Sequence, residues 1–177
     1  MKKCSKMMQS IINNPKPFIA QVSGTATAAG CQLVASCDLA YANTAAKFAT
    51  PGVNIGLFCS TPMVAISRNL SNKHSMEMLL LGELISSEKA AKIGLINEVS
   101  PDDKFKKFVL NKALKISKKS AITLKIGKQA FYKQIDMKLS EAYNYASKVM
   151  VENMLKLDAK EGIDAFINKR EPKWKDK

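Results

Sequence analysis

The stretch GTATAAGCQLVASCD, residues 24–38, decides the fold class of this chain. The apolar run FIAQV (18–22) before it is typical of a short buried strand, and Gly24 ends that strand. The small residues that follow predict a tight turn into a helix over about residues 29–36, and DLAYAN (38–43) predicts a second strand. A strand, a turn, a helix and a strand in this order indicate an α/β fold.

Short elements continue to alternate as far as residue 100. Pro51 and Gly52 open a segment that we expect to be irregular. Two helices follow, over residues 62–70 and 73–81, and Gly82 is expected to end the second one. Farther on, Ser86 is predicted as the N-cap of a short helix that Gly94 ends, and LINEV (95–99) as a strand.

Beyond residue 100 the pattern predicts helices alone. Their expected ranges are 101–117, 120–133, 138–156 and 158–169. No repeat or low-complexity linker separates the two parts. We therefore expect one domain, with a core in residues 1–100 and a helical region in residues 101–177.

The composition is that of a globular chain. With 177 residues, 46% of them hydrophobic, the chain is long enough to bury a core and too apolar for disorder.

The net charge of +13 lies at the two ends of the chain, because residues 1–16 carry +4, residues 17–100 are neutral and residues 101–177 carry +9. The charge comes from 26 lysines and 2 arginines, although arginine is the better ligand for phosphate. The basic helical region forms either a solvated face or a surface for anionic ligands or nucleic acid.

Several classes of protein are excluded by what the sequence lacks. No apolar run approaches the length of a membrane-spanning helix, and the basic first residues have no apolar signal core, so we expect an intracellular protein. The four cysteines form no CxxC pair and His74 is the single histidine, which argues against a zinc site and against a Ser/His/Asp triad. Cys31 and Cys37 lie in apolar sequence and are predicted as core residues.

Three ordered segments carry a family resemblance. They are PKPFIAQVSGTATAAGCQLVASCDLAYANTAAKFATPGVNIGLF (15–58), GELISSEKAAKIGLINEV (82–99) and EGIDAFINKREPKW (161–174). Together they resemble the enoyl-CoA hydratase/isomerase, or crotonase, family, and TAAGCQLVASCD, FATPGVN and GLFCSTP point to one subgroup of it. The resemblance implies the C-terminal part of a crotonase-like (ClpP/crotonase) spiral of β-β-α units with two roughly perpendicular sheets. It also implies that the C-terminal helices assemble trimers or hexamers.

The resemblance further implies acyl-CoA thioester chemistry through an oxyanion hole, with no cofactor or metal. Ala28, Ala29 and Gly30 match the family's small-residue turn. Ala29 falls at the position whose backbone N–H donates to the thioester oxygen, and Ala28 and Gly30 at positions that let the substrate approach. A helix N-terminus suits this task because its free N–H groups and positive dipole end face the developing negative charge.

The acid and base of the family's hydratases are replaced in this chain. Two glutamates activate water and deliver a proton in those enzymes, and the matching positions here are Gln32 and Gly52. A glutamine does not accept a proton at neutral pH, and glycine has no side chain. We therefore expect hydration to be impaired or lost, unless an acid among residues 136–164 serves instead.

Two residues of the helical region match positions that contact CoA in the family. Lys169 matches a lysine that binds the nucleotide phosphates, and Met150 stands where the family has an aromatic residue next to CoA. The alternative for Lys169 is a solvated helix end. Trp174 is expected to anchor the tail by packing.

Family members carry a further segment of strands and helices upstream of PKP, so we expect this chain to be N-terminally truncated. Unpaired strand edges would then make the isolated chain marginal unless it associates, as a homotrimer or hexamer or with a complementary N-terminal fragment. Three functions remain open: acyl-CoA handling in fatty-acid metabolism, a non-catalytic assembly or interaction role, and RNA binding. The resemblance places such a protein in the cytoplasm of bacteria and in the mitochondrial matrix of eukaryotes.

Overall fold

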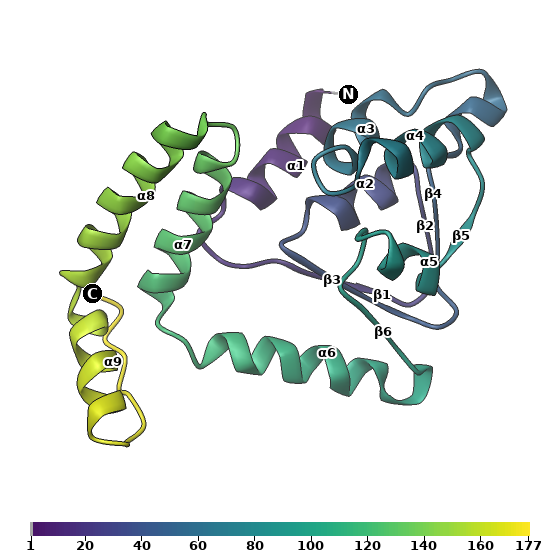
Figure 1. The fold of residues 1–177 in the computed structure, drawn as a ribbon. Helices are drawn as coiled ribbons and strands as arrows, with labels where there is room; N and C mark the ends of the chain where they lie inside the picture. Colours follow the sequence, from purple (N-terminus) through teal and green to yellow (C-terminus); the bar gives the residue numbers. More distant parts are fainter. Residues whose placement is uncertain (1) are drawn as a thin grey trace. The chain divides into compact units, whose positions relative to one another are not determined.

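The structure is a computed structural model and describes residues 2–177 (Figure 1). It contains two compact units. The first comprises residues 2–12 and 18–112, and the second comprises residues 13–17 and 113–177. This division lies beyond residue 100, where the sequence suggested a boundary, because the first part of α6 packs with the strands of the first unit.

The elements follow one another along the chain in this order. They are α1 (Lys2–Asn13), β1 (Ile19–Val22), β2 (Thr25–Thr27), α2 (Ala29–Ser36), β3 (Leu39–Asn43), β4 (Lys47–Ala49), the 3₁₀ helix η1 (Pro51–Ile55), α3 (Ser60–Ile66), α4 (Asn72–Leu81), β5 (Ile85–Ser86), α5 (Ser87–Lys92), β6 (Glu98–Ser100), α6 (Asp102–Ser117), α7 (Ala121–Gln134), α8 (Leu139–Met154) and α9 (Leu157–Ile167).

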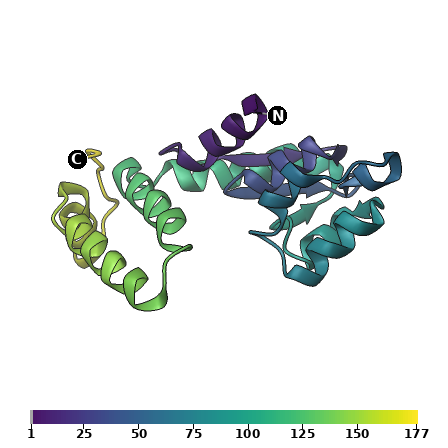
Figure 2. The same cartoon turned by 90° about the horizontal axis from the view of Figure 1, so that it is seen from above.

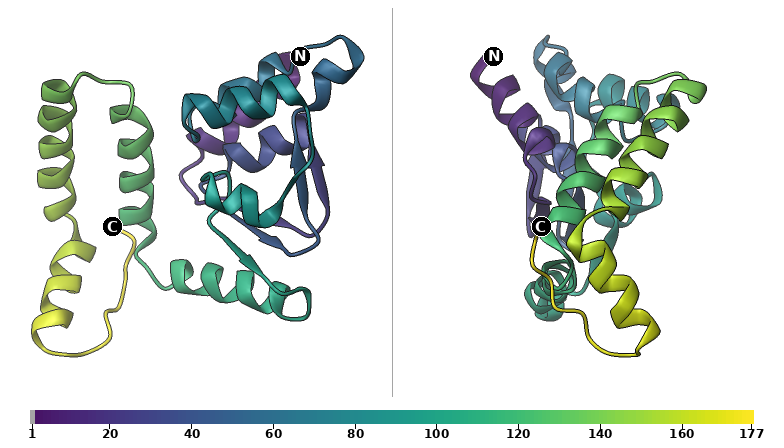
Figure 3. Two further views of the ribbon diagram at one scale, coloured as in Figure 1. Left: turned by 45° about the vertical axis from the view of Figure 1, so that its right-hand side comes forward. Right: turned by 90° about the vertical axis from the view of Figure 1, so that its left-hand side faces the viewer.

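The strands form two small sheets. One has the order β1-β3-β6 and is parallel throughout, with Ile19 opposite Leu39 and Tyr41 opposite Glu98. The other has the order β2-β4-β5, in which β2 and β4 are parallel and β5 is antiparallel to β4. The strands of the two sheets run in clearly different directions, as Figures 1 and 3 show.

A strand, a short strand and a helix form the repeating unit. β1, β2 and α2 make one repeat, and β3, β4 and α3 make the next, with η1 inserted before the helix. Each strand of the first repeat pairs in parallel with the corresponding strand of the second. This is the β-β-α spiral that the resemblance predicted, and α2 and α3 pack beside each other in it.

The core of the first unit lies between the strands and their helices. Its most completely buried side chains include Phe48 of β4, Ile66 of α3 and Cys31 of α2. A second cluster joins Tyr41 of β3 to Phe105 of α6, with the Tyr41 ring also edge-on to Phe108. The prediction that Cys31 is a core residue is confirmed, whereas Cys37 is only half-buried.

Local signals located most of the helix ends correctly. The Ser86 hydroxyl accepts a hydrogen bond from the amide of Lys89 at 3.2 Å, as expected of an N-cap. Gly82 follows α4 with a φ of 62°, and Gly94 has a φ of 90°.

The sequence pattern did not predict β2 and β5, because each is only two or three residues long and is defined by its pairing with β4. The segment expected to be irregular after Pro51 contains the 3₁₀ helix η1.

The larger part of the second unit is formed by α7, α8, α9 and the tail that follows them (Figure 2). The Trp174 indole N–H donates to the Lys118 carbonyl at 2.7 Å, and its ring covers Gly162 of α9, which confirms its anchoring role. Asp158 is 1% exposed and accepts hydrogen bonds from the amides of Lys175 at 2.7 Å and Asp176 at 3.1 Å. The tail is therefore held against the start of α9.

No helix among residues 2–177 is long and apolar enough to span a membrane. The Asp158 carboxylate of the second unit is buried and hydrogen-bonded. Burial acts to raise its pKa, but hydrogen bonds from Ser120, Lys175 and Asp176 outweigh that effect and leave the pKa below its usual value.

Replacing Asp158 by Asn should loosen the tail. The charged acceptor of two amides of the tail is lost, which costs about 1–3 kcal/mol of unfolding free energy. Because the folded pKa is lowered, the contribution of Asp158 is present above its ordinary pKa of 3.8 and is lost as the pH falls through the folded value. The fluorescence of Trp174, the only tryptophan, measures tail release against temperature and pH.

The matched control is Asp136→Asn, which removes an exposed carboxylate elsewhere in the second unit. A tail that is released at the same temperature and pH in both variants would contradict the role given to Asp158.

Candidate functional site

The N-terminus of α2 is the centre of the predicted site, and its backbone geometry is unusual. Ala28, the residue before the helix, has φ 47° and ψ −114°, a conformation that favours glycine. Two hydrogen bonds hold it there: its amide donates to the Ala49 carbonyl at 3.0 Å, and its carbonyl accepts from the Gln32 amide at 3.0 Å. The turn therefore joins α2 to the end of β4.

No side chain caps this helix. Ala28 makes no side-chain hydrogen bond to the first turn, unlike Ser71 and Ser86 at the starts of α4 and α5. The first-turn amides of α2, beginning with that of Ala29, therefore keep their hydrogen-bonding capacity together with the positive end of the helix dipole. Chemically, such an end can stabilise an oxyanion.

Gly30 is not required by packing. A Cβ built on it would meet only the Ala26 Cβ, at 3.9 Å, which is an ordinary van der Waals contact. Tight packing of α2 against the sheet therefore does not explain why this position is a glycine.

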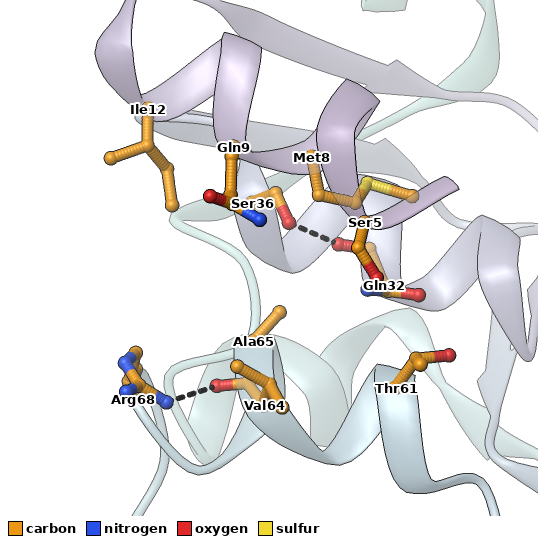
Figure 4. A pocket seen from close by; sticks show the side chains of 10 residues that line it. All are labelled: Ser5, Met8, Gln9, Ile12, Gln32, Ser36, Thr61, Val64, Ala65 and Arg68. Carbon is orange, nitrogen blue, oxygen red and sulfur yellow. Dashed lines mark hydrogen bonds between the residues drawn. The ribbon is translucent and has the colours of Figure 1, made fainter. Parts of the chain in front are cut away.

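Gln32 lies at the wall of a mostly apolar pocket of about 400 Å³ (Figure 4). The side chain is 4% exposed, and the Cys4 thiol lies 4.0 Å from its Oε1 atom. Residues of α1, α2 and the α3 region line the pocket: Ser5, Met8, Gln9, Ile12, Gln32, Ser36, Thr61, Val64, Ala65 and Arg68. These ten residues include one cation and no carboxylate, so the pocket wall provides no group to act as a general base.

Gly52 occupies a position that has no room for a side chain. A Cβ built there would lie 2.7 Å from the Leu57 carbonyl oxygen and 3.0 Å from the Cys59 Sγ atom. The loop closes on this residue, since the Gly52 carbonyl accepts from the Leu57 amide at 2.9 Å and the Gly52 amide donates to the Cys59 sulfur at 3.3 Å. A glutamate at Gly52 would require the backbone to move.

The same loop is tied to α4. The Asn54 side-chain amide donates to the Gly82 carbonyl at 3.2 Å, and the Thr50 hydroxyl donates to the Met78 carbonyl at 2.8 Å. Both ends of η1 are thus fixed, which resists the backbone shift that a side chain at Gly52 needs.

The thiol of Cys31, in α2, is not activated. Burial, with a smaller contribution from Cys59, raises the pKa of the Cys31 thiol to about 12. Cys31 is therefore protonated at neutral pH and is no nucleophile. Within residues 2–177, no three His, Cys, Asp or Glu side chains gather in a group that could hold a metal ion.

The two residues predicted to contact CoA lie in the second unit, whereas Ala28, Ala29, Gly30, Gln32 and Gly52 lie in the first. Lys169 directly follows α9 and has a positive φ of 50°. Met150 lies on α8 with 61% of its surface exposed.

Two features of the site could not be found from sequence. The contacts that fill the space at Gly52 come from Leu57 and Cys59, and they depend on how the loop folds back. The participation of α1 and Arg68 in the pocket depends on helix packing. The segment GLFCSTP (56–62) was one of those that pointed to a subgroup of the family, but the sequence gave no indication that its residues contact Gly52.

Comparisons with known proteins agree with this architecture. The sequence profile described as enoyl-CoA hydratase/isomerase matches residues 1–177. The chain is 50% identical over 171 residues to the mitochondrial enoyl-CoA hydratase domain-containing protein 3 of Rattus norvegicus, covering 97% of this chain and 57% of that protein. The chain thus spans less than three fifths of the length of that relative.

Two crystal structures are closely similar to this chain. An enoyl-CoA hydratase from Mycobacterium smegmatis superposes with a TM-score of 0.96 at 44% identity, over 98% of this chain and 67% of that one. The human enoyl-CoA hydratase domain-containing protein 3 gives a TM-score of 0.95 at 48% identity, over 98% and 68%. The predicted resemblance, including its subgroup, is confirmed. The chain belongs to the enoyl-CoA hydratase/isomerase family.

Proposed function

We propose that this protein binds acyl-CoA thioesters at the N-terminus of α2 and adds water to enoyl thioesters very slowly. One observation carries the proposal: the start of α2 is uncapped, but the two positions that match the family's acid and base, Gln32 and Gly52, have no carboxylate. Gln32 is a buried amide, and the space beside Gly52 is filled by Leu57 and Cys59.

Thioester binding depends on backbone atoms that the substitutions leave in place. The uncapped first turn of α2 offers the Ala29 amide to a thioester oxygen, and Gly30 leaves room around it. A relative of this chain is named as an enoyl-CoA hydratase, and the family assignment supports a CoA-related ligand.

Proton transfer is where this site differs from a two-glutamate hydratase. Losing one general acid or base typically lowers a rate by about 10²–10⁴-fold. Neither Gln32 nor Gly52 exchanges a proton, and no carboxylate lines the pocket beside Gln32. An acid from residues 136–164 is the remaining route to activity in the proposal.

The strain at Ala28 supports a functional role for this turn. A non-glycine residue with positive φ costs about 1–2 kcal/mol, and such strain concentrates at sites where geometry matters. Here the strained conformation is kept by two hydrogen bonds, from the Ala28 amide to Ala49 and from the Gln32 amide to the Ala28 carbonyl. These bonds position the start of α2.

The wider setting is also part of the proposal. Lys169 contacts the nucleotide phosphates of CoA and Met150 lies next to CoA, and the protein assembles as a homotrimer, a hexamer or a complex with a complementary fragment. It acts in fatty-acid metabolism, in the mitochondrial matrix if the source is a eukaryote, as the names of the rat and human relatives suggest, and in the cytoplasm if it is a bacterium.

A second candidate function, a non-catalytic assembly role, is favoured by the apolar surface of α8 and α9. Large apolar side chains on these helices are more than half exposed, a pattern typical of interaction surfaces. They include Leu139, Tyr143, Met150, Val151, Met154, Ile163, Phe166 and Ile167. This function predicts oligomers that persist after Lys169→Ala and no CoA binding.

Binding should depend on the thioester carbonyl. Butyryl-CoA is expected to bind about fivefold more tightly than S-butyl-CoA, a thioether without the carbonyl, because one hydrogen bond to the α2 terminus contributes about 1 kcal/mol. Isothermal titration calorimetry measures both ligands. Equal affinities would remove the role of α2, and no binding of either would favour the assembly function.

Hydration of crotonyl-CoA should be about 10⁴-fold or more below that of a two-glutamate hydratase, since two groups are missing. The ultraviolet absorbance of the conjugated thioester measures the rate, and Gln32→Ala should leave the residual rate unchanged. Rapid turnover that this substitution abolishes would show that Gln32 is catalytic.

Gly52→Ala should destabilise the first unit by about 1–3 kcal/mol, because the new Cβ overlaps the Leu57 carbonyl. Thermal unfolding measures the loss. Gly24→Ala is the control, since nothing lies within 4 Å of a Cβ there.

The double variant Gln32→Glu with Gly52→Glu should fail to restore hydration, because the loop has no room for a side chain at position 52. A stable, active double variant would show that the loop opens readily.

Ala28→Gly should raise the free energy of unfolding by about 0.5–1 kcal/mol. Relief of the positive-φ strain exceeds the entropy cost of glycine at this position. Ala29→Gly, one residue inside the helix, should lower it and serves as the control. Chemical denaturation compares the two, and the opposite order would show that Ala28 is not strained.

A further inference from the structure

The chain turns back on itself after α9 through a hydrogen-bonded turn that is common at helix C-termini. The Arg170 amide donates to the Ala165 carbonyl at 3.0 Å. The Lys169 amide donates to the Phe166 carbonyl at 3.3 Å. In such a turn the second residue after the helix has a left-handed backbone, and glycine is its usual occupant. Here that residue is Lys169, with a φ of 50°, so a side chain stands where the backbone disfavours one.

The side chain of the next residue, Arg170, ties this turn back to α9. Its two terminal nitrogens donate to the two carboxylate oxygens of Glu161, at 2.6 and 3.0 Å. One of these nitrogens also donates to the Asp164 carboxylate. A guanidinium suits this contact because its donors form a planar fork that matches a carboxylate. Since Glu161 and Asp164 belong to α9, the contacts fix the residue after Lys169 against the helix.

Glu161 has a second partner in the tail. Its carboxylate accepts from the Lys173 amide at 2.7 Å, and the side chain is only 22% exposed. The hydrogen bonds from Arg170, followed by the one from the Lys173 amide, lower the pKa of Glu161 to about 2. The same pairing raises the pKa of Arg170. Both groups are therefore charged at neutral pH, and the ion pair persists there.

The pairing leaves different tasks to the two adjacent cations. The charge of Arg170 is compensated by two carboxylates of its own chain. Lys169 is exposed, and among the described residues it takes part in no salt bridge. An anionic ligand at this turn would therefore meet the Lys169 ammonium, and Arg170 would act on that ligand only by holding the turn.

We propose that Arg170 is a positioning residue: its ion pairs with Glu161 and Asp164 hold the turn that presents the Lys169 ammonium to the phosphates of the CoA nucleotide. The inference rests on the phosphate contact of Lys169 in the proposed function and deepens it. Arg170 itself does not touch the ligand.

Two ligands separate the nucleotide contact from the thioester contact. Butyryl-CoA carries the phosphates, and S-butyryl-pantetheine has the same thioester without the nucleotide. Isothermal titration calorimetry measures both, and the ratio of their dissociation constants gives the preference for the nucleotide. Lys169→Ala should reduce this preference about fivefold, the loss expected for one hydrogen-bonded contact at an exposed site.

Glu161→Gln is the decisive variant. It makes the tail more positive and releases Arg170, so charge attraction or a direct contact from Arg170 would strengthen the binding of butyryl-CoA. Positioning predicts the opposite: butyryl-CoA should bind about threefold more weakly, with S-butyryl-pantetheine unchanged. Glu171→Gln is the matched control, because it removes an exposed carboxylate next to Arg170 and should not weaken binding.

The effect must also act through Lys169. In the Lys169→Ala background, Glu161→Gln should reduce the preference no further, because the group that it positions is absent. Trp174 fluorescence and circular dichroism establish that the second unit of each variant folds. If Glu161→Gln releases the tail, the milder variant Asp164→Asn takes its place. It removes one of the two partners of Arg170 and should weaken butyryl-CoA about twofold.

Two results would overturn the inference alone. One is butyryl-CoA binding that a folded Glu161→Gln or Asp164→Asn variant keeps or strengthens, and the other is an undiminished loss in the Lys169→Ala background. In both cases a reduced preference in Lys169→Ala would still support the phosphate contact. A preference that Lys169→Ala leaves unchanged, or no preference in the wild type, would reject that contact and the inference with it.

Discussion

The hydrogen bond from the Ala28 amide to the Ala49 carbonyl is the link on which the site depends. It connects the turn before α2 to the last residue of β4, and the chain then continues directly into η1. One interaction therefore positions both halves of the site, the helix end with Ala29 and the loop with Gly52. It also explains how Ala28 keeps a backbone conformation that its side chain disfavours.

The sequence predicted those features, such as helix ends and caps, that depend on residues close to one another in the chain. The extent of α2, the Ser86 cap and the left-handed Gly82 each follow from a local preference, and the structure bears them out. The short strands β2 and β5 could not be predicted, because their own residues do not specify them and pairing with β4 does. The positive φ of Ala28 was equally hidden, since alanine gives no signal for it. The resemblance identified Gly52, but only three-dimensional contacts show that its side-chain space is filled.

The two chemical tasks of a thioester site respond differently to substitution. Stabilising an oxyanion uses backbone N–H groups, which remain when a glycine becomes an alanine, provided that the turn keeps its shape. Moving a proton uses a titratable side chain and ends when that side chain is replaced. In this chain the uncapped end of α2 at Ala29 offers backbone N–H groups of this kind, whereas Gln32 carries a buried amide, which does not titrate.

The closure of the loop on Gly52 has an evolutionary consequence. Because the Leu57 carbonyl and the Cys59 sulfur occupy the volume that a side chain at Gly52 needs, a substitution by glutamate must first reopen a turn that Asn54 and Thr50 hold against α4. Such a substitution lowers stability at once, so selection acts against it before a carboxylate at this position could take part in any reaction.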